Sequence, residues 1–218
     1  GVPAGSIKAV IGPNGAGKTT LFTHIAGNLP ESAGTIRLQG EAIQGRKPHQ
    51  IARLGMARTF QIVKPFASKS VLYNVTVGSF ATCERRGEAE DKALKVLEFL
   101  GLSDKKDTRA GNLTIADRKR LEVARALATE PKLLLLDEVM AGLRPSEVDE
   151  VVEMIRMIRA SGVTILLIEH HMDLVMDIAD RIYVLDFGKL IAQGTPEEIQ
   201  SNEHVIDAYL GVVEDAED

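Results

Sequence analysis

The 218-residue sequence lacks the features that mark several classes of protein. It has a single cysteine, Cys83, which excludes an internal disulfide framework, agrees with a reducing cytosol and is interpreted as an ordinary thiol. Its longest apolar stretches, Leu133–Leu136 and Val163–Ile168, are far shorter than the ~20 residues that cross a bilayer. No signal-peptide pattern opens the sequence. We therefore expect no membrane-spanning segment and no secretion. Any association with a membrane is expected to come through a partner.

The sequence also lacks an excess of positive charge. Its formal net charge is −5 and its pI is about 5.6, so no overall basic field exists to hold nucleic acid, and no nucleic-acid partner is expected. Apolar residues make up 44% of the chain. This content and length suit one large domain, or a domain with an inserted lobe.

Short apolar runs alternate with helical patterns, which indicates an α/β sheet with crossover helices. The run Ser6–Ile11 predicts a strand that enters a glycine-rich turn, and Thr19–Ala26 predicts the helix that follows. The segment Pro145–Ala160 has apolar residues at helical spacing. Further strands are expected at Thr35–Leu38, Lys132–Leu136, Val163–Ile168 and Ile182–Leu185.

A different pattern occupies the middle of the chain. Residues 63–128 predict two or three amphipathic helices and no strand. One of them, Asp91–Leu100, is expected to place Ala93, Leu94, Leu97 and Leu100 on one face. The expected organisation is an α/β core formed by residues 1–62 and 129–200, an inserted helical subdomain at 63–128, and a C-terminal helix with an acidic tail at 201–218.

The clearest motif is Gly12–Thr19, which fits G-x-x-x-x-G-K-[ST] without a mismatch and lies between an expected strand and helix. Glycines let backbone N–H groups surround a phosphate, and the helix N-terminus adds favourable partial charge. Lys18 is expected to reach the outer phosphates, and the Thr19 hydroxyl to bind Mg²⁺. The alternative is a plain glycine-rich turn. The expected nucleotide-binding residues here are Gly12, Pro13, Asn14, Gly15, Ala16, Gly17, Lys18, Thr19 and Thr20.

Two adjacent carboxylates, Asp137 and Glu138, follow the apolar run Leu133–Leu136. In a chain with a phosphate loop, this pair predicts that Asp137 holds Mg²⁺, directly or through water. Glu138 points elsewhere and is expected to polarise the attacking water as a general base. Without the phosphate loop, the pair would be an ordinary solvated strand end.

Two further segments make the sequence resemble the nucleotide-binding subunit of ABC transporters. The segment Arg58-Thr59-Phe60-Gln61 resembles the Q-loop of that family, which implies that Gln61 contacts Mg²⁺ or the attacking water. The segment Leu167–His170 resembles the strand end with the switch histidine, which implies that His170 contacts the γ-phosphate of ATP. An alternative metal site at His170 and His171 is not expected, because adjacent strand residues face opposite sides.

The signature segment of the family corresponds to Leu113, Thr114, Ile115, Ala116 and Asp117, followed by the well-matched run Arg118–Leu127. The resemblance implies that this segment caps a helix whose positive end meets the ATP of the opposite subunit. Both glycines of the pattern are replaced. Ala116 adds a methyl group and Asp117 a carboxylate near the phosphate, so a weaker contact is expected. Locally, Asp117 is expected to be the N-cap of the helix.

The loop after Glu138 points to one subfamily. Its residues Ala141-Gly142-Leu143, followed by Pro145, are similar to the D-loop of importer ATPases for branched-chain amino acids, and segments 55–61, 71–77 and 188–198 agree. Two positions depart from the family pattern. The family usually has a proline where this chain has Val139, and an acid or amide where it has Arg144. The resemblance covers nearly the whole chain. No aromatic residue precedes the phosphate loop to stack on adenine, so the chain is interpreted as a fragment or the base contact lies elsewhere.

The resemblance implies an α/β P-loop NTPase (RecA-like) with a parallel-sheet core and an inserted helical subdomain. It implies an ATPase with ATP and Mg²⁺ as cofactors. The implied partners are a second ATP-binding subunit, integral-membrane permease subunits and, indirectly, a periplasmic or extracellular binding protein. The implied location is the cytoplasmic face of the cell membrane, as a peripheral subunit. Phe66 and Tyr73 are candidates for docking a permease loop, with core packing as the alternative.

The sequence leaves two alternatives open and disfavours two others. A regulatory module that dimerises with ATP but hydrolyses it poorly is suggested by Ala116 and Asp117, and a different transport substrate also stays open. An ATPase of translation or DNA maintenance is disfavoured, because the 119 positions from Lys18 to Asp137 leave no room for a long coiled coil. A small GTPase is disfavoured because no N-K-x-D motif occurs.

Overall fold

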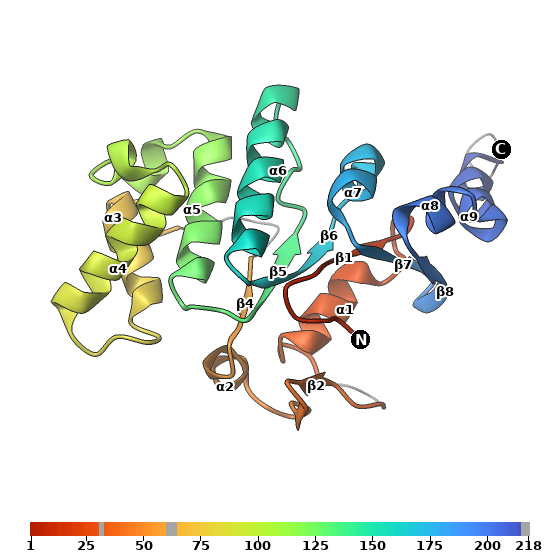
Figure 1. The fold of residues 1–218 in the computed structure, drawn as a ribbon, viewed down its shortest axis with the longest axis horizontal. Coiled ribbons are helices and arrows are strands. Elements are labelled where there is room, and N and C mark those ends of the chain that lie inside the picture. The colour runs from red at the N-terminus through yellow and green to blue at the C-terminus, as the bar shows by residue number, and fades with distance from the viewer. Residues whose placement is uncertain (31–32, 60–64, 215–218) are drawn as a thin grey trace.

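The computed structural model describes residues 1–30, 33–59 and 65–214, and within these residues a twisted six-stranded sheet forms the centre of the molecule (Figure 1). The strand order is β4-β5-β6-β1-β7-β8, in which β8 pairs antiparallel with β7 and all other pairs are parallel. The strands are β1 (Ile7–Ile11), β4 (Met56–Arg58), β5 (Leu133–Asp137), β6 (Thr164–Ile168), β7 (Arg181–Asp186) and β8 (Lys189–Gly194). The expected α/β class with a parallel-sheet core is confirmed.

Helices cover both faces of the sheet. Helix α1 (Lys18–Ile25) lies on one face, and α6 (Pro145–Ala160) and α7 (Met172–Ile178) lie on the other (Figure 1). Because successive strand residues point to opposite faces, Ile7 of β1 joins the large apolar cluster under α6, whereas Val10 packs with Phe22 of α1. This double burial explains the nearly continuous apolar strands in the sequence.

A group of helices lies beside the sheet and contains α3 (Val71–Ser79), α4 (Arg86–Phe99) and α5 (Ile115–Leu127), with short 3₁₀ turns at Ser103–Lys105 and Ala110–Asn112. The expectation that Leu94 shares the buried face of α4 is wrong, since it is 38% exposed while Ala93, Leu97 and Leu100 are buried. Positions 93, 97 and 100 recur at four and three residues, which makes one stripe on a helix. Residue 94 is turned about 100° away from that stripe.

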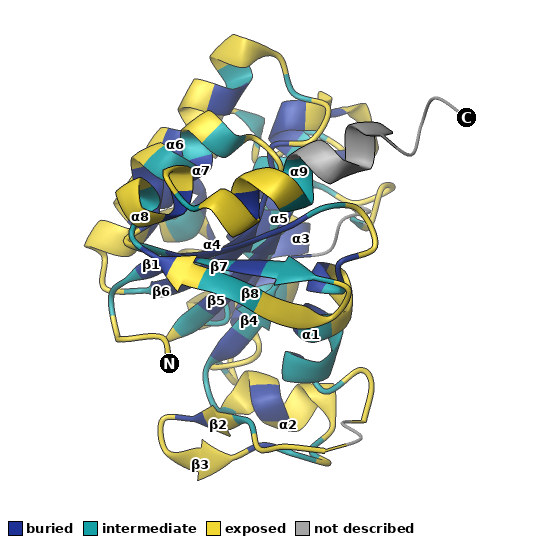
Figure 2. Cartoon of the chain, turned by 90° about the vertical axis from the view of Figure 1, so that its right-hand side faces the viewer, coloured by how far each residue is buried: buried dark blue, intermediate teal, exposed yellow. Residues whose placement is uncertain are grey.

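Smaller elements surround the sheet. The expected strand at 35–38 is reduced to β2 (Arg37–Leu38), which pairs with β3 (Glu41–Ala42). This hairpin and α2 (Pro48–Arg53) lie below the sheet and are largely exposed (Figure 2). Helices α8 (Pro196–Gln200) and α9 (Glu203–Glu214) follow β8. Of these elements, β3, α2 and α8 were not expected from the sequence. No helix in the described part of the chain is long and apolar enough to cross a membrane.

Candidate nucleotide site

The glycine-rich loop connects the carboxyl end of β1 to the start of α1. Gly12, Gly15 and Gly17 have φ values of 147°, 82° and 95°, which side-chain-bearing residues rarely adopt. At Gly12 a Cβ would lie 2.0 Å from the carbonyl oxygen of Leu185, so no other residue fits there without movement. Beside the loop is a cavity of about 220 Å³ lined by Asn14, Gly15, Ala16, Gly17, Lys18, Thr19, Thr20, Glu138 and His170. The fold thus brings the loop together with the two catalytic candidates from β5 and β6.

Lys18 is the cation of this loop and is only 6% exposed. Its Nζ donates hydrogen bonds to the carbonyl oxygens of Gly12 and Pro13 at 2.7 and 2.9 Å. Burial lowers the pKa of Lys18, while the charges of Glu138 and Asp137 act in the opposite direction. Phosphate oxygens are stronger acceptors for an ammonium group than neutral carbonyls, so a bound polyphosphate can take over these bonds.

Asp137, the expected metal ligand, is 1% exposed at the end of β5. Its Oδ2 accepts a hydrogen bond from Arg58 Nη2 at 2.9 Å, and its backbone N–H donates to Thr59 Oγ1 at 3.2 Å. Oδ1 is buried without a hydrogen-bond partner among the described residues. A buried carboxylate oxygen with a free lone pair is a site that a hydrated cation fits. Thr19 lines the loop cavity, whereas Gln61 lies outside the described residues.

Glu138, the expected general base, lies next to His170. His170 Nε2 is 2.8 Å from Glu138 Oε1, and the glutamate side chain is 15% exposed. The backbone of Glu138 has a φ of 50°, which costs on the order of 1–3 kcal/mol and turns its side chain into the loop cavity. Its N–H donates to the carbonyl of Ile168 at 2.9 Å, which ties the end of β5 to the end of β6.

The two adjacent histidines meet different carboxylates. His170 contacts Glu138, whereas His171 Nδ1 is 3.7 Å from Oε2 of the buried Glu169. Glu169 also accepts a hydrogen bond from the Met140 N–H at 3.0 Å. Burial raises the pKa of Glu169. Sequence reasoning missed Glu169, although a carboxylate directly after four apolar strand residues signals a buried group that needs partners.

The signature residues lie at the start of α5, in the helical region, and none of them lines the loop cavity. The expectation that Asp117 is the N-cap is wrong. Thr114 is the N-cap, since its Oγ1 accepts from the Asp117 N–H at 3.1 Å. Thr114 has the extended backbone that a cap requires, whereas Asp117 is already helical. Asp117 is buried, and both its oxygens accept from Lys105 Nζ at 2.9 Å. Ile115 is 59% exposed, and Ala116 is buried.

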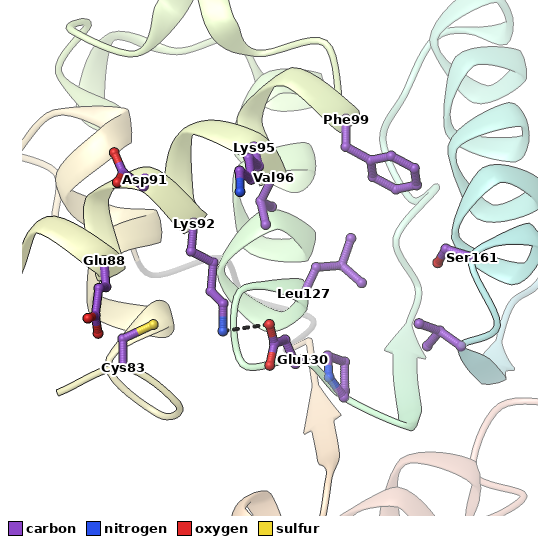
Figure 3. Close-up of a pocket in the computed structure, with 12 residues that line it drawn as sticks. Cys83, Glu88, Asp91, Lys92, Lys95, Val96, Phe99, Leu127, Glu130 and Ser161 are labelled. Atoms are coloured by element: carbon purple, nitrogen blue, oxygen red, sulfur yellow. Dashed lines mark ion pairs between the residues drawn. The ribbon is translucent and has the colours of Figure 1, made fainter. Parts of the chain in front are cut away.

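A larger hollow lies away from these residues, between α4 and the ends of α5 and α6 (Figure 3). It measures about 680 Å³ and has an apolar wall that includes Phe99 and Leu127. Lys92 crosses it to pair with Glu130 at 2.7 Å, and the half-buried Cys83 lies at one end. None of the expected nucleotide or catalytic residues lines this hollow. The loop cavity is therefore the candidate site.

A phosphate loop between a parallel strand and a helix, with an acidic strand end beside it, defines a P-loop nucleotide-binding protein. The family described as ABC transporter matches residues 1–141, and a family described as branched-chain amino acid ATP-binding cassette transporter matches residues 189–215. The chain belongs to the ABC transporter family, binds ATP and is an ATPase.

Relatives are similar over nearly the whole chain. The high-affinity branched-chain amino acid transport ATP-binding protein LivG of Salmonella typhimurium is 44% identical over 94% of this chain and 87% of its own length. A probable LivG of Archaeoglobus fulgidus is 39% identical over 97% of this chain and 87% of its own length. The crystal structure of the ADP conformation of an ATP-binding cassette of an ABC transporter superposes with a TM-score of 0.87, at 32% identity, over 96% of this chain and 89% of that one.

Proposed function

We propose that this chain hydrolyses ATP with Mg²⁺ to energise a membrane importer for branched-chain amino acids. The observation that carries the proposal is the loop cavity, in which the buried Lys18 faces a carboxylate, Glu138, held by His170. Lys18 neutralises phosphate charge, and Glu138 orients and polarises the attacking water. His170 holds Glu138 before ATP arrives and contacts the γ-phosphate afterwards.

Mg²⁺ fits the donors of this site. Asp137 offers the buried Oδ1, which has no partner among the described residues, and Thr19 offers a hydroxyl at the start of α1. Gln61 is proposed as a further ligand. When bound, Mg²⁺ neutralises charge on the transferred phosphoryl group. Asp137 and Thr19 supply hard oxygen donors, which this ion prefers.

The signature segment is proposed to complete the site of a second ATP-binding subunit, in a homodimer or a heterodimer. Within one chain it lies outside the loop cavity, so its helix end is available to a nucleotide held by another copy or a sister subunit. Asp117 brings a carboxylate to this end, but Lys105 pairs with both its oxygens and balances the charge. A solved cassette at 18% identity that shares this fold is described as a dimeric post-hydrolysis state.

Phe66 and Tyr73 are proposed to receive a loop of the permease subunits. They are 46% and 47% exposed and meet edge to face, with ring centroids 6.1 Å apart. Core packing therefore does not account for them. Arg125 lies 5.3 Å from the centre of the Phe66 ring, and Lys69 the same distance from that of Tyr73. Exposed aromatic pairs with cations are typical of interaction surfaces.

The chain is thus proposed to act at the cytoplasmic face of the membrane, bound to permease subunits and linked through them to a binding protein. The choice of branched-chain amino acids follows the names of the relatives and the match at residues 189–215.

The experiment is to purify the chain with its permease, reconstitute it with its binding protein, and measure ATPase activity. Leucine, isoleucine or valine should stimulate activity, whereas stimulation by an unrelated substrate class alone would overturn this assignment.

The substituted signature favours one second candidate, a module that dimerises with ATP and hydrolyses it poorly. Ala116 is buried in the position where backbone approaches phosphate in the family pattern. Measuring ATP-dependent dimer formation and ATPase rate in the same preparation separates the two functions. Dimers that form without multiple turnovers of ATP would favour the regulatory module.

A further inference from the structure

Lys119 connects the signature helix α5 to the turn that carries Glu138. Its Nζ donates a hydrogen bond to the backbone carbonyl oxygen of Glu138 at 2.9 Å. Lys119 lies one turn from the helix start and is half-buried, and burial lowers its pKa, with Glu169 as the main opposing charge. In a partly buried environment, a charged donor makes a stronger hydrogen bond to a carbonyl oxygen than a neutral donor does.

The turn after β5 needs such support. Glu138 has a left-handed backbone, with φ at 50°, and this conformation persists only where the surroundings enforce it. Its N–H is held by the carbonyl of Ile168 and its carbonyl by Lys119. Two residues on, the Met140 N–H is held by Glu169. The turn is thus fixed from β6 on one side and from α5 on the other.

We propose that Lys119 is a positioning residue for ATP hydrolysis. By holding the carbonyl of Glu138, it keeps the backbone rotated so that the carboxylate stays in the loop cavity beside His170. This inference rests on the role proposed for Glu138. The geometry places one direct contact between the helix that begins within the signature segment and the turn that carries the proposed base.

The competing interpretation is that Lys119 only balances the charge of Glu169 in the interior. Removing it would then destabilise the fold without acting on Glu138 in particular. The two interpretations differ in what they predict for kcat, for KM and for coupling to Glu138. A positioning role lowers kcat at saturating ATP and leaves KM nearly unchanged, because Lys119 does not line the loop cavity.

The test compares Lys119→Met and Lys119→Arg with the unchanged chain. Methionine keeps most of the apolar stem and removes the charged donor, whereas arginine keeps a donor. We expect kcat of Lys119→Met to fall on the order of 10-fold to 100-fold, as for a misplaced catalytic group, with KM for ATP within about 2-fold. Lys119→Arg should recover most of the loss. The matched control, Lys92→Met, removes a remote half-buried lysine and should leave both constants unchanged.

A double-mutant cycle with Glu138→Gln completes the test. If Lys119 acts through Glu138, Lys119→Met has little further effect in the Glu138→Gln background. Wild-type kcat in Lys119→Met, equal losses in Lys119→Met and Lys119→Arg, or losses that multiply with those of Glu138→Gln would overturn the inference. If Glu138→Gln itself hydrolyses ATP at the unchanged rate, the role proposed for Glu138 fails first. Circular dichroism and a thermal midpoint check that each variant folds, and Lys119→Gln replaces Lys119→Met if the latter does not.

Discussion

Arg58 and Asp137 form an ion pair inside the protein, with Nη2 and Oδ2 2.9 Å apart and side chains only 9% and 1% exposed. The pair joins the edge strand β4 to the end of β5, directly before the segment that contains Gln61. Arg58 also lies over the Phe22 ring of α1, with its guanidinium carbon 5.9 Å from the ring centre. One oxygen of Asp137 is thus held by Arg58, and the other, Oδ1, has no hydrogen-bond partner among the described residues.

Arg58→Met should strongly destabilise the fold, because it leaves a buried carboxylate without its partner. Breaking a buried pair from one side costs about 3–5 kcal/mol in the free energy of unfolding. Urea denaturation measures this change. Arg46→Met, which breaks the exposed pair with Glu41, is the control and should cost less than about 1 kcal/mol. Equal effects of the two changes would contradict a buried role for Arg58.

Gly12→Ala should damage the phosphate loop, because its Cβ would meet the Leu185 carbonyl oxygen at 2.0 Å. Gly142→Ala is a control at another glycine with a positive φ, 76°, and with open space where its Cβ would lie. We expect Gly12→Ala to cost roughly 1–3 kcal/mol more than the control and to abolish ATP binding. Thermal unfolding with and without ATP measures both effects. Normal ATP-induced stabilisation of Gly12→Ala would show that the loop tolerates a side chain.

Glu169 should make stability depend on pH. Its pKa is raised by burial above the ordinary value of 4.5, so the folded protein holds this proton at pH values where the unfolded chain has lost it. The contribution of Glu169 to the free energy of unfolding is therefore lost as pH rises. The loss begins near the pKa of Glu169 in the unfolded chain and continues through its pKa in the folded protein. Glu169→Gln keeps an oxygen for the Met140 N–H and removes the titration.

The difference in unfolding free energy between Glu169→Gln and the unchanged chain should grow as pH rises through that window. Chemical denaturation at a series of pH values measures it. Glu153→Gln, on the exposed side of α6, is the control and should show no comparable trend. A constant difference for Glu169→Gln would mean that neighbouring cations cancel the effect of burial.

Much of the sheet could be predicted from the sequence, because its strands are buried on both faces and leave long apolar runs. Helix α6 matches its expected bounds, Pro145–Ala160, since a proline starts it and its apolar stripe is regular. Strand β4 was missed because its three residues are too few to show a pattern. Strand β8 was missed because its residues are mostly exposed or half-exposed and lie at the edge.

The candidate site divides in the same way. The phosphate loop and the acidic strand end could be located because each is contiguous in the chain. Arg58 and Lys119 could not be assigned, since their contacts reach 79 and 19 positions along the chain to Asp137 and Glu138. The cap at Thr114 was misassigned to Asp117 because both residue types favour helix starts, and only the backbone distinguishes them.

Glu138 is proposed to activate the attacking water in a site built by the phosphate loop. The measurement is steady-state ATP hydrolysis by Glu138→Gln, with ATP affinity measured in parallel and Glu130→Gln as a remote control. Turnover should fall on the order of 10²–10⁴-fold while ATP still binds, because the amide keeps the shape of the side chain but cannot accept the proton. Hydrolysis at the unchanged rate by purified Glu138→Gln would contradict the account.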